Sequence, residues 1–173
     1  VKKIAQEKLE PLGEAGLLES AKLYEKMNAN EDALEMFQKL HSQNPEKISY
    51  LNEIAKINLK MGNLKEAEDY YVKADKLAPG HLERVEKMAD LYLQLREPEK
   101  AMEKMRESID YSPDNPDVKF SMYEKLSQAG YEKYARDFCE ETSSAKEVIR
   151  FYNNKGVVLA KQKKHEEAIS WYK

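Results

Sequence analysis

The residues best able to carry out chemistry are three histidines, one cysteine and the abundant carboxylates. His41, His81 and His165 lie far apart, and none is spaced from Cys139 or from another histidine as metal ligands are. The sequence contains no glycine-rich phosphate loop and no G-x-S-x-G nucleophile motif. Carboxylates on a polar helix face are usually solvated, and catalysis would need a cleft that shifts their pKa values. We therefore expect no catalytic residue, no cofactor and no metal site.

The composition narrows the class of protein further. The chain has 173 residues, of which 35% are charged and 41% hydrophobic, and its net charge is −3. A protein that binds duplex nucleic acid usually has a basic excess, so we expect no nucleic-acid partner. No stretch approaches the ~18 uninterrupted apolar residues of a membrane span. The single cysteine excludes an intrachain disulfide framework and a zinc ribbon.

Two ladders of residues share one period. Alanines recur every 34 residues from Ala33 to Ala135, and Ala168 follows after 33. Prolines recur with the same period of 34 residues at Pro11, Pro45, Pro79 and Pro113. A fixed period of roughly 20–50 residues is typical of a protein built from stacked repeats.

Each period has the pattern of a helical hairpin. In residues 48–81, apolar residues at helical spacing are interrupted by Gly62 and Asn63, and a second apolar stripe ends at Pro79. Gly62 can take the left-handed conformation that ends a helix, and Asn63 is a suitable N-cap. Pro98 lies where a second helix begins and its missing N–H costs little. Neither helix can bury its stripe alone, so the hairpins are expected to stack.

These positions resemble those of the tetratricopeptide repeat family. Residues 14–47 match its pattern of large, small and aromatic residues with Leu17, Ala21, Tyr24, Ala33, Phe37 and Pro45. Residues 48–81 match at Leu51, Ala55, Gly62, Ala67, Tyr71, Ala74 and Pro79, although Asn58 replaces the usual aromatic. The resemblance implies an all-α fold, a right-handed α-solenoid of stacked antiparallel helix pairs. The small residues would permit close helix contacts, and the aromatic residues would be core rather than ligand-binding.

The pattern defines one continuous domain of five units. The units are 14–47, 48–81, 82–115, a degenerate unit 116–148 and a truncated unit 149–173, preceded by residues 1–13 as the second helix of an earlier repeat. The chain begins with Val1 and stops at Trp171-Tyr172-Lys173, within a helix. We therefore expect a fragment of a larger protein.

The unit 116–148 departs from the pattern at three positions. Lys119 replaces a large apolar residue, Tyr123 a small one and Cys139 an aromatic one. Either its second helix ends early or the stack bends there. A diverged unit supported by its neighbours is favoured over a functional site, and Cys139 is expected to be a buried residue rather than a reactive thiol.

In the family, the first helices of the units line a concave groove that binds a partner peptide or helix. The corresponding residues here are Leu18, Lys22, Lys26, Asn52, Lys56, Leu59, Lys60, Glu86, Asp90, Leu93, Phe120, Glu124 and Asn153. The first two units contribute the lysines and the next two contribute the carboxylates. We therefore expect a protein-interaction scaffold that holds an acidic part of its partner against the lysines. Alternatively, these charges are merely solvated.

Other functions fit the sequence less well or remain open. The carboxylate clamp of chaperone-binding relatives is absent, because Glu53 and Glu83 stand at two of its positions. Acidic residues in the groove also disfavour binding of single-stranded RNA. Self-association through the terminal helices, with exposed apolar ends at Ile4 and Trp171-Tyr172, is an alternative that fits a spacer in a bacterial assembly or signalling protein. A cytoplasmic location is the default expectation.

Overall fold

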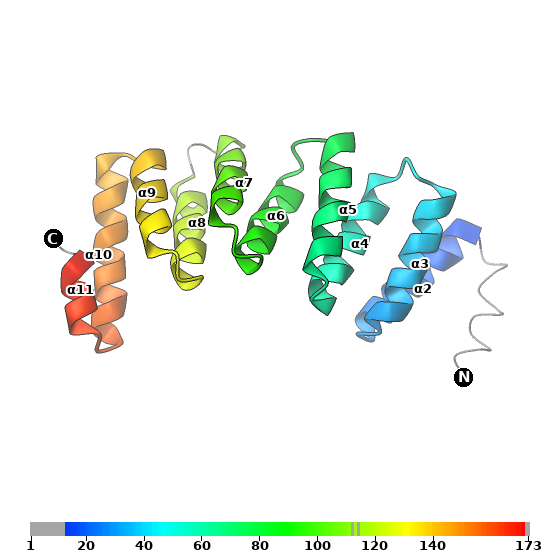
Figure 1. Cartoon of the computed structure of the whole chain (residues 1–173), viewed down its shortest axis with the longest axis horizontal. Coiled ribbons are helices and arrows are strands. Elements are labelled where there is room, and N and C mark those ends of the chain that lie inside the picture. Colours follow the sequence, from blue (N-terminus) through cyan, green and yellow to red (C-terminus); the bar gives the residue numbers. More distant parts are fainter. Residues whose placement is uncertain (1–12, 112, 114, 172–173) are drawn as a thin grey trace. The chain divides into compact units, whose positions relative to one another are not determined.

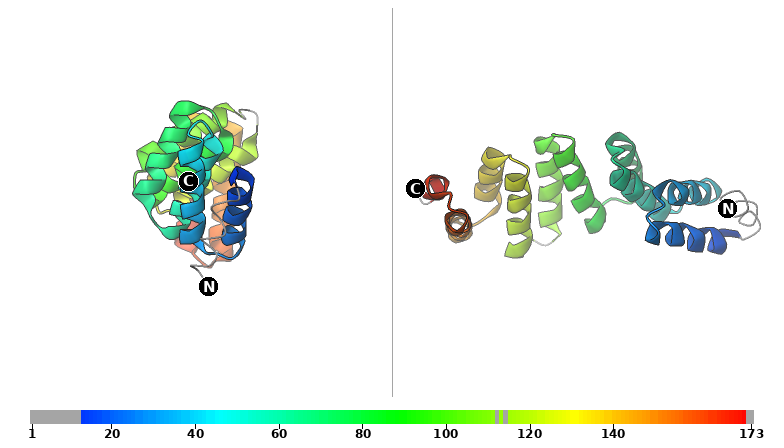
Figure 2. Two further views of the ribbon diagram at one scale, coloured as in Figure 1. Left: turned by 90° about the vertical axis from the view of Figure 1, so that its right-hand side faces the viewer. Right: turned by 90° about the horizontal axis from the view of Figure 1, so that it is seen from below.

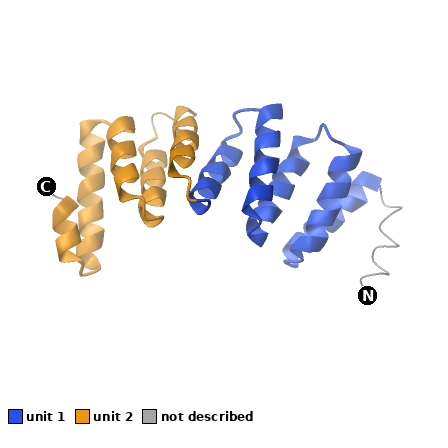
Figure 3. Cartoon of the chain, viewed as in Figure 1, with its two compact units in different colours: residues 1–95 blue, residues 96–173 orange. Residues whose placement is uncertain are grey.

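The computed structural model describes residues 13–111, 113 and 115–171, which form ten helices and no strand (Figure 1). The chain divides into two compact units, residues 1–95 and 96–173 (Figure 3). The predicted all-α class of paired helices is confirmed. The predicted helix of a preceding repeat lies, in its residues 1–12, outside the described residues, as do Ile4 and Tyr172.

Five described helices make up the first unit. They are α2 (Gly13–Lys26), α3 (Asn30–Gln43), α4 (Ile48–Met61), α5 (Leu64–Leu77) and α6 (Leu82–Gln94). The pairs α2–α3 and α4–α5 are antiparallel and lie side by side, as the views from different sides agree (Figures 1 and 2). Helix α4 also packs on α3, and α6 packs on α5, so each of these first helices covers the apolar side of the pair before it.

The core of the first unit contains the residues that the repeat pattern places inward. Ala21, Ala33 and Ala55 are 0% exposed, so the helices can approach closely at these positions. Phe37 and Tyr71 are each 1% exposed and supply apolar area between the helices. Both predictions, small residues at close contacts and aromatic residues in the core, are confirmed here.

The turns inside the hairpins repeat one backbone conformation. A positive φ occurs at Asn28 (54°), Gly62 (80°), Arg96 (61°), Gly130 (85°) and Lys163 (63°). The first four are 34 residues apart and the last follows after 33. At Gly62 the predicted left-handed helix end is confirmed, and the N–H of Asn63 donates to the carbonyl of Asn58 at 2.9 Å. This bond satisfies a carbonyl that the helix end would otherwise leave unpaired.

Asn58, which stands where the family usually has an aromatic residue, is buried with its polar atoms satisfied. It is 3% exposed, its Nδ2 donates to the carbonyl of Ile54 at 2.9 Å, and its Oδ1 accepts from Asn63 Nδ2 at 3.2 Å. Asn63 is the N-cap residue of α5, but its side chain makes no capping hydrogen bond. The predicted N-cap position of Asn63 is therefore confirmed, although its side-chain amide donates to Asn58 and does not cap the helix.

The second unit contains five further helices. They are α7 (Pro98–Asp110), α8 (Pro116–Gln128), α9 (Glu132–Thr142), α10 (Ala145–Lys161) and α11 (His165–Trp171). Pro98 opens α7 as expected. Helices α8 and α9 form one pair and α10 and α11 another, while α7 packs on both α8 and α9.

The irregular hairpin α8–α9 exchanges a small and a large residue. Tyr123 is 0% exposed at the small position, and Cys139 is 1% exposed at the position where other units carry a large residue. The Tyr123 ring stacks on Phe151, with centroids 6.1 Å apart and planes at 15°. The predicted burial of Cys139 is confirmed, and this burial raises the pKa of its thiol to about 11, which disfavours the reactive thiolate.

The connection after α9 explains why the closing proline is missing. Helix α9 has 11 residues, against 14 in α3 and α5. The chain then begins α10 early, at Ala145, through a capping box in which Ser144 and Glu147 bond to each other's backbone N–H. Of the two outcomes considered for this unit, early termination of the second helix is the one observed.

Trp171 does not form an exposed apolar end. It is 5% exposed and packs edge-on against Tyr123, with ring centroids 6.0 Å apart. The guanidinium carbon of Arg136 lies 3.7 Å from the centroid of the Trp171 ring. The expectation of an exposed Trp171 is therefore wrong, because the large residue at position 123 and the cation from α9 cover its ring.

Candidate functional site

The residues predicted for the groove all lie on the first helices of the pairs. In the first unit they are on α2, α4 and α6, and in the second unit on α8 and α10. None of the 13 is buried. They are therefore accessible to a partner within each unit.

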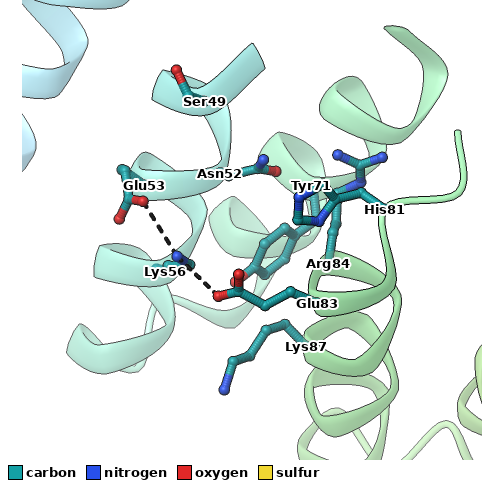
Figure 4. A pocket seen from close by; sticks show the side chains of 9 residues that line it. All are labelled: Ser49, Asn52, Glu53, Lys56, Tyr71, His81, Glu83, Arg84 and Lys87. Atoms are coloured by element: carbon teal, nitrogen blue, oxygen red, sulfur yellow. Dashed lines mark hydrogen bonds and ion pairs between the residues drawn. The ribbon is translucent and has the colours of Figure 1, made fainter. Parts of the chain in front are cut away.

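A cavity of about 180 Å³ lies between α4 and α6 in the first unit (Figure 4). Its lining residues are Ser49, Asn52, Glu53, Lys56, Tyr71, His81, Glu83, Arg84 and Lys87. Helix α4 supplies one wall, α6 and the residue before it supply the other, and Tyr71 comes from α5 between them. The structure therefore brings two predicted groove residues, Asn52 and Lys56, into one concave site.

Lys56 bridges the two walls of the cavity. Its Nζ lies 3.2 Å from Glu53 Oε1 on its own helix and 3.1 Å from Glu83 Oε1 on α6 (Figure 4). Desolvation opposes the charge of Lys56, but the bonds to Glu83 and Glu53 outweigh it and raise the pKa of Lys56. The same bond to Lys56 lowers the pKa of Glu83. The positive charge of Lys56 is therefore largely balanced by carboxylates of the chain itself.

Arg84 closes the floor of the cavity at its α6 side. Its side chain is 1% exposed and its Nε lies 3.1 Å from Asp75 Oδ1. Its Nη2 donates a hydrogen bond to the carbonyl of Ala78. A buried guanidinium needs such partners, because an uncompensated charge in the interior is costly. These partners hold Arg84 as part of the wall.

Two polar atoms at the cavity have no hydrogen-bond partner in the described part of the chain. They are the hydroxyl of Tyr71 and Oδ1 of Asn52, and both are buried atoms. Burial, reinforced by the charges of Glu53, Glu83 and Asp90, raises the pKa of Tyr71, so its hydroxyl stays protonated and can donate.

The other predicted lysines behave differently from one another. Lys60 Nζ lies 3.4 Å from Glu25 Oε1, which ties α4 to α2. Lys22 and Lys26 are exposed and line a second cavity, of about 450 Å³, along α2. Neither contacts a carboxylate among the described residues. Of the positive charge expected from the four predicted lysines, the part that is not already paired with a carboxylate is thus mainly that of Lys22 and Lys26.

In the second unit the predicted residues are more dispersed. The centroid of the Phe120 ring lies 5.2 Å from that of Phe151 on α10, so part of the apolar surface that Phe120 could offer to a partner is already in contact with this helix. Glu124 accepts a bond of 3.5 Å from Gln128, and Asn153 is exposed. The described residues contain no cluster of three metal-ligating side chains, and none of their helices could cross a membrane.

The sequence matches the pattern of the tetratricopeptide repeat family over residues 15–47, 48–81, 86–115 and 149–173. The chain belongs to the tetratricopeptide repeat family. The matches omit the whole of 116–148, the unit in which large and small residues are exchanged. Membership of this family supports the predicted role as a protein–protein interaction scaffold.

Solved structures share the repeat fold at low sequence identity. A MamA crystal structure is 16% identical with a TM-score of 0.66, covering 92% of this chain and 87% of MamA. MamA from Desulfovibrio magneticus RS-1 is 11% identical with a TM-score of 0.68, covering 92% and 90%. YrrB, described as a tetratricopeptide repeat protein with an unusual peptide-binding site, is 16% identical with a TM-score of 0.63, covering 96% and 87%. A search of curated proteins found no match.

The repeat pattern alone missed several residues of the cavity. Tyr71 was assigned to the core, which is correct for its ring but overlooks its unpartnered hydroxyl. Arg84 lies one 34-residue period after Tyr50, at a position that faces the preceding repeat. A charged residue at this position, where the previous unit has a tyrosine, was the sequence feature that could have indicated a polar cavity here. The pairing of Lys56 with Glu83 needed the distance between α4 and α6, which no sequence pattern gives.

Proposed function

We propose that this chain is a non-catalytic scaffold that binds a peptide or helix of a partner protein along its tetratricopeptide repeat groove. The observation that carries the proposal is the accessible concave site between α4 and α6, which contains the predicted residues Asn52 and Lys56. The peptide-binding site in the description of YrrB is consistent with it.

The acidic part of the partner would lie against Lys22 and Lys26. These two lysines are one helical turn apart and line the cavity along α2. Lys56 and Lys60 already face carboxylates, so they contribute less attraction to an anionic partner. Leu18, Leu59 and Leu93 are half-buried and would provide apolar contacts beside the charges.

A display library of random peptides tests this function with a defined probe. Peptides selected on the wild-type chain are expected to be enriched in Asp and Glu, and to bind the Lys22→Glu/Lys26→Glu variant at least about tenfold more weakly. The matched control is Lys73→Glu/Lys76→Glu on α5, which changes the net charge equally away from the first helices. Peptides that bind the two variants alike would contradict the placement, and recovery of no peptide would contradict the function.

Self-association is a second candidate, favoured by exposed apolar residues near the ends of the described chain. Leu23 on α2 is 58% exposed, Met27 in the turn after it is 66% exposed, and Ile169 on α11 is 53% exposed. Sedimentation equilibrium of the wild type and of Leu23→Glu/Met27→Glu tests it. A dimer that dissociates in the variant supports this function, whereas a monomeric wild type excludes it.

A further inference from the structure

The cavity between α4 and α6 has unused hydrogen-bonding capacity from two helices. The hydroxyl of Tyr71, on a side chain that is 1% exposed, and Oδ1 of Asn52 are both buried and both lack a partner among the described residues. A buried polar group without a partner costs free energy, so such groups are normally paired. Figure 4 shows the Tyr71 ring between the side chains of α4 and those of α6, where an occupant of the cavity would meet it.

The charges around the cavity disfavour an ionic occupant of either sign. An anion would be attracted by Lys87, but it would also meet the carboxylates of Glu53 and Glu83, whose compensating cation, Lys56, is shared between them. A cation would be repelled by Lys56 and Lys87, and the nearby carboxylate of Asp75 is already paired with Arg84. An apolar occupant would leave the hydroxyl and the amide oxygen unpaired. The remaining class is uncharged and polar.

We propose that the cavity receives a primary carboxamide, the side-chain amide of an Asn or Gln residue of the partner. Its oxygen accepts from the Tyr71 hydroxyl, one N–H donates to Asn52 Oδ1, and the second N–H donates to a rim carboxylate of Glu53 or Glu83. A backbone amide has only one N–H and cannot serve both acceptors. The volume of about 180 Å³ accommodates this group, since a water molecule occupies about 30 Å³ in the liquid.

This inference rests on the proposed function, because the amide belongs to a partner segment lying in the groove. It adds the side-chain specificity of one position in that segment. Lys22 and Lys26 would attract the acidic part of the segment, and the cavity would select the residue that reaches between α4 and α6.

Small-molecule probes test the chemistry without a known partner. Acetamide, N-methylacetamide, acetate and methylammonium are titrated into the chain carrying ¹³C-labelled tyrosine, and the Tyr71 ring resonances are followed by NMR. Acetamide is expected to shift these resonances saturably and to bind at least about fivefold more tightly than the other three. Tighter binding of acetate, methylammonium or N-methylacetamide would overturn the proposal, as would the absence of any saturable shift.

Three variants separate binding from folding. Tyr71→Phe removes only an unpartnered hydroxyl, so its midpoint of urea unfolding should be unchanged while acetamide binding, followed on a labelled Asn52 amide, falls roughly tenfold. Tyr123→Phe, in the second unit, removes a buried tyrosine hydroxyl that likewise has no partner among the described residues, and it should leave acetamide binding unchanged. Glu83→Gln removes a repelling carboxylate and should raise acetate binding relative to acetamide.

The outcomes distinguish this inference from the function on which it rests. Acidic peptides that depend on Lys22 and Lys26, together with acetamide binding that is insensitive to Tyr71→Phe, would overturn the inference and leave the function standing. A loss of stability in Tyr71→Phe would also overturn it, because the hydroxyl would then have a partner in the free chain.

Discussion

The hairpins α4–α5 and α8–α9 solve the same packing problem with opposite residues. The regular hairpin places Ala55 on its first helix and Tyr71 on its second, whereas the irregular hairpin places Tyr123 on its first and Cys139 on its second. All four side chains are at most 1% exposed. Close packing depends on the summed volume at a helix contact, and the exchange conserves that volume approximately. At these two positions the unit that differs by residue type is therefore as fully buried as its regular counterpart.

The largest effect is expected from restoring the family's small residue in the irregular hairpin. Tyr123→Ala should lower the free energy of unfolding by about 3–5 kcal/mol, because it leaves a cavity beside Phe151 and Trp171. Urea denaturation measures the loss. Adding Cys139→Tyr should recover part of it, since the pair then follows the regular order. An unchanged stability in Tyr123→Ala would mean that position, rather than volume, decides the packing.

The turns inside the two hairpins should respond identically despite the exchange. Gly62 and Gly130 both have a positive φ, and a Cβ added at either would meet no atom within 4 Å. The cost of Gly62→Ala and of Gly130→Ala is therefore purely conformational, about 1–2 kcal/mol in each case. Thermal or urea unfolding checks the equality. A clearly larger loss at one glycine would show that the two turns differ in more than their neighbours.

The connections that follow the two hairpins differ, and this difference is expected to matter less. The regular hairpin is followed by Pro79 and Gly80, whereas the irregular one is followed by the Ser144 cap of α10. Ser144→Ala should cost about 1 kcal/mol, and Ser144→Asp, which can still cap, should cost less. Circular dichroism during urea unfolding measures both variants. Equal losses in the two would exclude a capping role.

The smallest effect is expected from the ion pairs that join successive first helices. Glu83→Gln removes the pair with Lys56 and should cost less than about 1 kcal/mol at neutral pH, because the carboxylate is exposed and screened by water. The pKa of Glu83 is lowered from 4.5 in the folded chain, so the pair stabilises above about pH 4.5 and is lost as the pH falls further.

The difference between the wild type and Glu83→Gln should therefore shrink below pH 4.5. Glu46→Gln, which removes an exposed carboxylate in the turn before α4, is the matched control. A gap that widens in acid would contradict the sign of the pKa shift. In the second unit a different ion pair, Lys119 with Glu147 at 3.8 Å, joins α8 to α10, and it lies deeper because the Lys119 side chain is 13% exposed.

The sequence was sufficient to predict the helix pairs because their determinants are local and periodic. Small residues such as Ala55 and Ala89 and the break at Gly62 recur at one spacing, and helix contacts require them there. The irregular unit could not be understood from positions alone, because compensation between Tyr123 and Cys139 is a property of the contact. Trp171 was misjudged for the same reason, as its cover comes from residues distant in sequence.

The candidate site was predictable in location but not in chemistry. Asn52 and Lys56 were placed in the groove by their positions in the repeat, and the cavity contains both. Which charges remain available depends on distances between helices, as the pairing of Lys56 with Glu83 shows. The unpartnered hydroxyl of Tyr71 is invisible in a pattern that classifies residues by size.

The left-handed turns have a consequence for how such a chain can change in length. The same backbone conformation is held by Asn28, Gly62, Arg96, Gly130 and Lys163, so it persists through four residue types. A recombination event that joins any two of these turns would delete or duplicate one or more repeat lengths, connect a first helix to the second helix of another hairpin, and restore the same dihedral angle at the junction. The residue missing from the period lies after Gly130, in the shortened α9 and its connection to α10, and leaves the turns intact.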